Sequence, residues 1–79
     1  MNIEHISWRD ACSEDNDWIS TRKAIKQAKQ KLPLIESVGF VLHEDKDAIT
    51  LVHSFDKEDS LVTPAIKIPK KWIIKRKKL

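Results

Sequence analysis

The chain has few of the residues that build tight turns and cofactor loops. Its 79 residues include one glycine, Gly39, three prolines and no tyrosine. A single glycine excludes the Gly-rich loops that cradle phosphate groups. Turns must therefore be made by Asp, Asn, Ser and Pro, and the clearest predicted loops lie at 45–47 and 56–60.

Cysteine is almost absent too. The lone Cys12 excludes an internal disulfide and a cysteine-based metal cluster, which favours a reducing compartment. Near the N-terminus the longest uncharged stretch is 6–8, too short for a signal-peptide core. No run approaches the roughly 20 apolar residues that span a bilayer. We expect a protein of the host-cell cytoplasm that has no membrane partner.

Length and composition predict one small folded domain over 1–79. A chain of this size buries only about 60% of its unfolded surface and forms a single core. The hydrophobic content of 41% is too high for a disordered chain, although 34% of residues are charged. Folds that need a cleft between two domains are excluded by length.

The net charge of +3 hides four blocks of alternating sign. Residues 1–20 hold five acids and one base, and residues 21–31 hold five bases and no acid. Residues 36–59 are acidic again, whereas residues 60–79 carry seven bases and no acid. The blocks either attract one another within the fold or form a basic docking face.

Alternation predicts a first strand over 2–8 with Ile6 and Trp8 inward. Apolar spacing predicts a short basic helix over 21–31, capped by Thr21 and stopped by Pro33.

The centre of the chain predicts a hairpin around a loop at 44–47. Parity then pairs four positions across it: His43 with Ala48, Leu42 with Ile49, Phe40 with Leu51, and Val38 with His53. The expected core face is Val38, Phe40, Leu42, Ile49 and Leu51. Gly39 permits strong bending or the close approach of a neighbour.

Two more strands are expected at 62–68 and 72–76, separated by a short turn at 69–71. Pro64 lacks a backbone donor and places the first of these at a sheet edge or a bulge. The order of strand, helix-bearing connection, three strands, one-turn link and strand predicts a mainly β fold with one short helix. Its expected form is a small five-stranded SH3-like barrel.

Several short motifs occur in a fixed order: Trp8-Arg9-Asp10-Ala11, Ser37-Val38-Gly39-Phe40, Thr50-Leu51-Val52-His53-Ser54 and Ile68-Pro69-Lys70. In these the chain resembles a family of small uncharacterised phage and prophage proteins. The resemblance spans nearly the whole chain and implies a viral setting and a barrel-like fold, without any catalytic residue. The basic stretches 22–31 and 75–78 depart from the family pattern.

Catalytic and metal sites are disfavoured. The expected hairpin register puts His43 and His53 on opposite faces, so they do not share an ion, and His53 is expected at the edge of the core. Cys12 with His5 is the one pairing worth naming, and the acids that follow Cys12 raise a thiol pKa. We therefore expect no enzymatic activity, no metal and no cofactor.

The basic blocks carry the sharpest functional hypothesis. Trp72 lies among cations and either stacks on a nucleic-acid base or seals one end of the core. The cations either form a docking surface or only solvate an edge strand. Trp8 and Trp18 are expected to cover the core, and exposure of either marks a protein-binding surface. The candidate binding residues are Lys70, Lys71, Trp72, Lys75, Arg76, Lys77, Lys78, Arg22, Lys23 and Lys26.

These observations predict a non-catalytic accessory protein, encoded by a phage or prophage, that binds a macromolecule. A host or phage protein is the preferred partner. The alternative is weakly sequence-specific nucleic-acid binding through the basic C-terminal strand.

Overall fold

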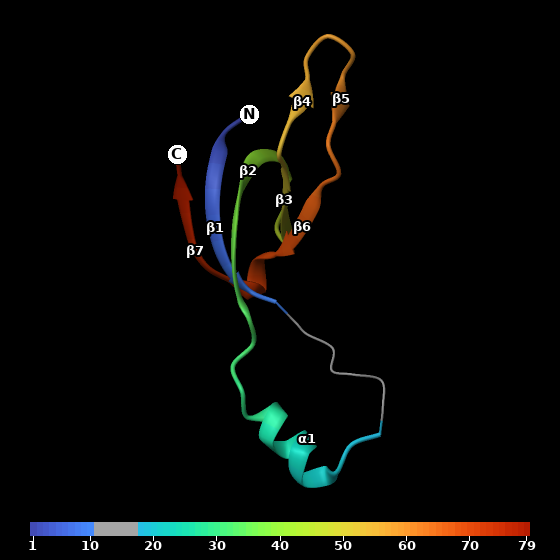
Figure 1. Cartoon of the computed structure of the whole chain (residues 1–79). Helices are drawn as coiled ribbons and strands as arrows, with labels where there is room; N and C mark the ends of the chain where they lie inside the picture. Colours follow the sequence, from blue (N-terminus) through green and yellow to red (C-terminus); the bar gives the residue numbers. More distant parts are fainter. Residues whose placement is uncertain (11–17) are drawn as a thin grey trace.

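The computed structural model describes residues 1–10 and 18–79, and it is built mainly from β-strands (Figure 1). The elements are β1 (Ile3–Arg9), α1 (Thr21–Ala28), β2 (Leu34–Glu44), β3 (Ala48–Val52), β4 (Phe55–Asp56), β5 (Leu61–Val62), β6 (Ile66–Pro69), the 3-10 helix η1 (Lys70–Trp72) and β7 (Ile73–Lys78). The predicted mainly β class with one helix is confirmed.

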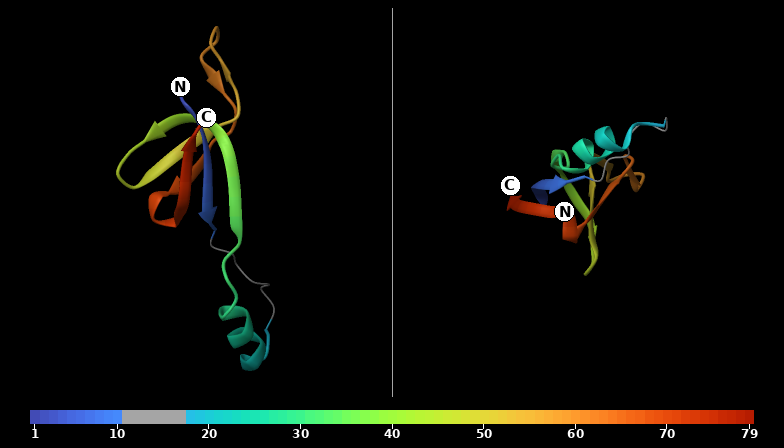
Figure 2. Two further views of the ribbon diagram at one scale, coloured as in Figure 1. Left: turned by 90° about the vertical axis from the view of Figure 1, so that its left-hand side faces the viewer. Right: turned by 90° about the horizontal axis from the view of Figure 1, so that it is seen from below.

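Five strands form an antiparallel sheet in the order β6-β3-β2-β1-β7 (Figures 1 and 2). Strands β4 and β5 form a separate two-stranded ribbon. The predicted closure into a barrel is not observed, because β6 and β7 end the sheet and do not pair with each other. Strand β6 has only four residues and η1 follows it immediately, and among residues 1–10 and 18–79 the strand β7 pairs with β1 alone.

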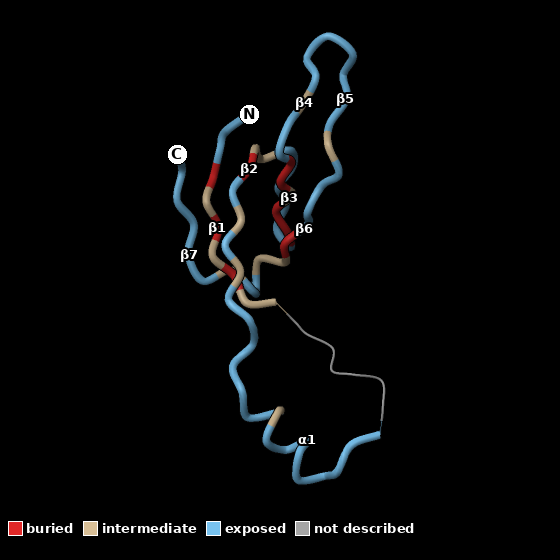
Figure 3. Tube along the Cα trace, viewed as in Figure 1, coloured by how far each residue is buried: buried red, intermediate tan, exposed pale blue. Residues whose placement is uncertain are grey.

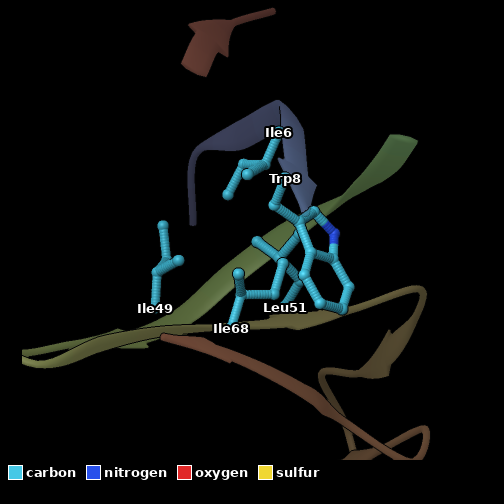
Figure 4. Close-up of a cluster of buried hydrophobic side chains, with 5 residues drawn as sticks. All are labelled: Ile6, Trp8, Ile49, Leu51 and Ile68. Carbon is cyan, nitrogen blue, oxygen red and sulfur yellow. The ribbon is translucent and has the colours of Figure 1, made fainter. Parts of the chain in front are cut away.

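The core lies on one face of the curved sheet, where β1, β3 and β6 contribute buried side chains (Figures 3 and 4). Its members are Ile6, Trp8, Ile49, Leu51 and Ile68, each no more than 5% exposed. Burying a large aliphatic side chain contributes about 1.5 to 3 kcal/mol. The predicted inward direction of Ile6 and Trp8 is confirmed.

The predicted register of the central hairpin is wrong. The observed partners are Phe40 with Val52, Val41 with Leu51, and Glu44 with Ile49, with an irregularity between Val41 and His43. Directly opposed residues share a face of an antiparallel sheet, so Phe40 and Leu51 lie on opposite faces.

The turn and the irregularity together explain the difference. The Asp45 carboxylate accepts hydrogen bonds from the backbone N–H groups of Asp47 and Ala48, at 2.8 and 3.0 Å, so the loop begins one residue later than predicted. Leu42 is the extra residue of the irregularity, which reverses the parity of β2.

The apolar residues of β2 are consequently not those expected in the core. Val38 is 47% exposed and Leu42 is 41% exposed. Phe40 lies on the face opposite Leu51, where its ring meets Phe55 edge to face at a centroid distance of 5.0 Å. Only Ile49 and Leu51 of the predicted core face are buried.

Gly39 allows β2 and β3 to approach closely. A Cβ atom at this position would lie 2.8 Å from the Val52 carbonyl oxygen and 3.3 Å from the Leu51 Cβ. The first distance is shorter than an ordinary van der Waals contact. The expected close neighbour of Gly39 is therefore confirmed, with the backbone of β3 in that position.

Helix α1 lies on an arm that extends away from the sheet (Figures 1 and 2). The Oγ atom of Ser20 accepts a hydrogen bond from the Lys23 backbone N–H at 3.2 Å, so Ser20 caps the helix where Thr21 was expected. The helix ends at Ala28, earlier than predicted, and contains no buried residue. Within the described residues, no helix has the length and hydropathy required to cross a membrane.

The predicted strand over 62–68 is interrupted. Its first residue belongs to the β4-β5 ribbon, and its last part forms β6, which is an edge strand as Pro64 indicated.

The Thr63 Oγ accepts hydrogen bonds from the backbone N–H groups of His53 and Ser54 at 3.1 and 3.2 Å. His53 itself is exposed, so its expected place at the edge of the core is wrong.

Candidate functional site

The C-terminal candidates converge on one edge of the sheet. Lys70, Lys71 and Trp72 form η1, and the other four lie on β7. Because side chains alternate along a strand, opposed partners reveal the face of each one. Arg76 lies opposite Ile6 and Lys78 opposite Glu4, on the core side. Lys75 and Lys77 project from the outer face.

Arg76 is held by two carboxylates. Its Nε and Nη2 atoms donate to the two oxygens of Glu4, each at 2.9 Å, and its Nη1 and Nη2 atoms donate to Glu44 at 2.9 and 3.0 Å. Glu4 is only 3% exposed, so this acid depends on the guanidinium for compensation. The two carboxylates raise the pKa of Arg76.

Lys70 completes the same network. Its Nζ lies 2.7 Å from the Glu44 Oε2. Hydrogen bonds from Arg76 and Lys70 lower the pKa of Glu44 to about 2. Two of the predicted binding cations are thus neutralised by acids of this chain and tie β1, β2, η1 and β7 together.

Four cations of this edge lie outside that network. Within residues 1–10 and 18–79, no acid lies at ion-pair distance from Lys71, Lys75, Lys77 or Lys78. All four are exposed. We call these four residues the free lysines.

Trp72 packs against the core and is also partly exposed, while its stacking on a nucleic-acid base stays a prediction. Its ring stacks on Trp8 at a centroid distance of 6.4 Å and an interplanar angle of 12°, yet 39% of the residue is exposed. Stacking on buried Trp8 fixes η1 against the core. Trp72 directly follows the free lysine Lys71 in η1.

The helical candidates form a separate group. Arg22, Lys23 and Lys26 lie on α1, which the views of Figures 1 and 2 place on the arm and not beside β7. Trp18, next to the helix, is fully exposed, so its predicted role as a lid over the core is wrong. Cys12 and the acids at 14, 15 and 17 lie outside the described residues.

The histidines do not assemble a metal site. The His5 Nε2 lies at hydrogen-bond distance from a Glu36 carboxylate oxygen on the outer face, and the His43 Nε2 lies 3.6 Å from an Asp45 carboxylate oxygen. Hydrogen bonds from Ser7 and His5 lower the pKa of Glu36. In the part of the chain that the structure describes, no three His, Cys, Asp or Glu side chains come together as metal ligands.

Sequence reasoning did not identify Glu4 as a functional partner of the basic strand. A signal was present, because Glu4 has the same parity as inward Ile6 and Trp8. An acid on a core face needs a cationic partner.

Comparison with protein-family models, curated proteins and solved structures gives no significant match.

Proposed function

We propose that this chain is a small non-catalytic module that binds another protein through the free lysines of η1 and β7. The observation that carries the proposal is that some cations of the basic C-terminal block form ion pairs within the chain and others do not. Arg76 and Lys70 are neutralised inside the molecule, whereas the free lysines lie exposed on η1 and on the edge strand β7. Exposed cations on a rigid strand attract an acidic partner surface and speed its association.

The proposal includes the finer class of fold. The order β6-β3-β2-β1-β7, with a single turn of helix between β6 and β7, supports an SH3-like arrangement that is open at one side. In this arrangement α1 occupies the long connection after the first strand. The resemblance in the Trp8, Gly39 and Pro69 motifs supports a phage or prophage accessory role in the host cytoplasm.

A protein partner is favoured over nucleic acid because the surface is not uniformly positive. Glu36 lies close enough to Lys75 for the lysine to contribute to its lowered pKa, and Glu44 lies beside Lys70. Acids beside the cations oppose the approach of a polyphosphate backbone. They are compatible with a protein surface of mixed charge.

Nucleic-acid binding is the second candidate, and the exposed part of Trp72 supports it. An aromatic side chain beside lysines is the usual platform for stacking an unpaired base, worth about 1 to 3 kcal/mol per base. One ring face of Trp72 is already stacked on Trp8, which limits the area open to a base.

The test compares two variants of equal charge. Lys75→Gln with Lys77→Gln removes two cations from β7, and Lys23→Gln with Lys26→Gln removes two from α1. Each protein is immobilised and exposed to a lysate of the cells that naturally produce it. We expect the wild-type chain and the α1 variant to retain the same dominant protein with or without nuclease. The β7 variant should lose it.

Equal retention by the β7 variant would refute the proposal. Loss of the retained protein after nuclease treatment would favour the second candidate. That candidate further requires binding to single-stranded DNA that weakens steeply as salt rises.

A further inference from the structure

The outer backbone edge of β7 is open. β7 is the last strand of the sheet, and within residues 1–10 and 18–79 only β1 packs extensively against it. The termini lie near each other beside this strand (Figures 1 and 2). The opposite edge, β6, is shorter and ends in Pro69, which has no backbone donor. β7 is therefore the better edge for an added strand.

The hydrogen-bond pattern shows which backbone groups face outward. The Leu79 N–H donates to the Ile3 carbonyl at 2.9 Å, and this pair continues the register of β1 with β7. Hydrogen-bonded pairs recur at every second residue of an antiparallel ladder. The N–H and C=O groups of Lys77 therefore face β1, and those of Arg76 and Lys78 point to the open edge.

The second side of β1 agrees with this alternation. The Val41 N–H donates to the Asn2 carbonyl at 2.8 Å, in register with the pairing of β1 and β2. Even-numbered residues of β1 thus bond to β2, and odd-numbered residues bond to β7.

Charge decides which strand can occupy the edge. A second copy of β7 would bring its lysines against those of the first, and like charges on neighbouring strands are destabilising. On the outer face, Lys75 and Lys77 are two residues apart and have no ion-pair partner among the described residues. An extended segment with acids at every second position would match them.

From this edge we infer that the partner's contact segment is an acidic extended strand that adds to β7 as a sixth strand. The inference rests on the proposed function and specifies its mode. Backbone groups of Arg76 and Lys78 bond to the incoming strand, while Lys75 and Lys77 pair with its acids. The irregularity between Ser7 and Trp8 ends the regular ladder, so the regular edge is 75–78.

Two peptides separate strand addition from attraction between charges. The first is a capped octapeptide in which Glu and Thr alternate, so that all carboxylates lie on one face of an extended strand. The second has the same sequence with every backbone nitrogen methylated, which keeps the charge and removes the backbone donors. Each is added at millimolar concentration to the full chain, and backbone amide exchange is followed by NMR.

We expect the unmethylated peptide to slow exchange of the Arg76 and Lys78 amides by about tenfold. The Lys77 amide, which already faces β1, should change less. The methylated peptide should slow neither outward amide.

Two protein variants sharpen the test at one position. Lys78→Ala and Lys78→Pro both remove the cation, but only the proline also removes the outward N–H. The alanine variant should keep the slowed exchange at Arg76, and the proline variant should lose it.

Other outcomes overturn strand addition. If both peptides perturb β7 equally without slowing exchange, the contact is made by charge alone, and protein binding by the free lysines stands. If neither peptide acts, strand addition is wrong, and the retention experiment decides the proposed function separately. Slowed exchange that depends on protein concentration without peptide would identify a second copy as the occupant.

Discussion

The Arg76 network predicts a large loss of stability from one substitution on an otherwise tolerant strand. Arg76→Met keeps a long aliphatic side chain against the sheet and removes all four hydrogen bonds to Glu4 and Glu44. Glu4 then remains 3% exposed with no other side-chain partner within the described residues. An uncompensated buried carboxylate is the source of the expected loss.

The magnitude follows from the burial of the two partners. Removing one partner of a buried ion pair costs about 3 to 5 kcal/mol. Because the Arg76 side chain is 32% exposed, water reaches part of the pair and reduces this figure. We expect a loss of about 2 to 3 kcal/mol in the free energy of unfolding. With a urea dependence of about 1 kcal/mol per M for a domain of this size, the midpoint should fall by about 2 to 3 M.

The assay is urea unfolding at neutral pH, followed by tryptophan fluorescence. Lys75→Met is the matched control, because it removes one cation from the next position of the same strand without breaking a described ion pair. We expect the control to change stability by no more than about 0.5 kcal/mol. Adding Glu4→Gln to Arg76→Met should recover part of the loss. Equal midpoints for Arg76→Met and Lys75→Met would refute the reasoning.

Three further predictions test the same structure. Hydrogen bonds from Arg76 and a lysine lower the pKa of Glu44 to about 2, so the stability that Glu44 confers is complete above its ordinary pKa of 4.5 and is lost as pH falls toward 2. The difference in urea midpoint between wild type and Glu44→Gln should therefore shrink between pH 4.5 and 2, and a constant difference would contradict this prediction. Gly39→Ala should cost about 1 to 3 kcal/mol in urea unfolding, because its Cβ meets a carbonyl oxygen at 2.8 Å; an unchanged midpoint would contradict the close approach. Trp72→Ala should abolish the near-ultraviolet circular dichroism of its stack on Trp8 and lower stability; an unchanged spectrum would count against the stack.

Alternation predicted which residues of β1 and β3 enter the main core cluster. In β1, Ile6 and Trp8 share one parity, and the intervening Ser7 is polar, so the inward face was unambiguous. In β3, Ile49 and Leu51 were correctly placed in the core, although the apolar Ala48 and Val52 of the other parity are buried as well.

The core-facing side of β2 could not be predicted from alternation, because apolar residues occur at both odd and even positions of this strand. Phe40 and Leu42 suggested one face, but Ile35 and Val41 offer another, and these two pack against the core. The extra residue between Val41 and His43 depends on contacts with β3, which no local pattern specifies.

The sequence predicted which cations belong to the candidate site, but not which of them form ion pairs within the chain. All four residues of the run 75–78 are cations, and the local sequence pattern does not show that Arg76 is the one with an internal ion pair. Its partner Glu4 lies 72 residues away in the sequence and meets it only after β1 and β7 pair. Guanidinium geometry suits this role, since it can bind two carboxylates at once, which a lysine ammonium does less well.

The buried acid also determines which lysines lie on the outer face of the sheet. Because the Glu4 carboxylate is satisfied by Arg76 on the core side, the neighbouring positions of β7 must project from the outer face. A slip of β7 by one residue would turn Arg76 outward and leave Glu4 buried without its guanidinium. The ion pair therefore fixes the register of β7. Through that register it holds Lys75 and Lys77 on the surface and directs the backbone groups of Lys78 to the open edge.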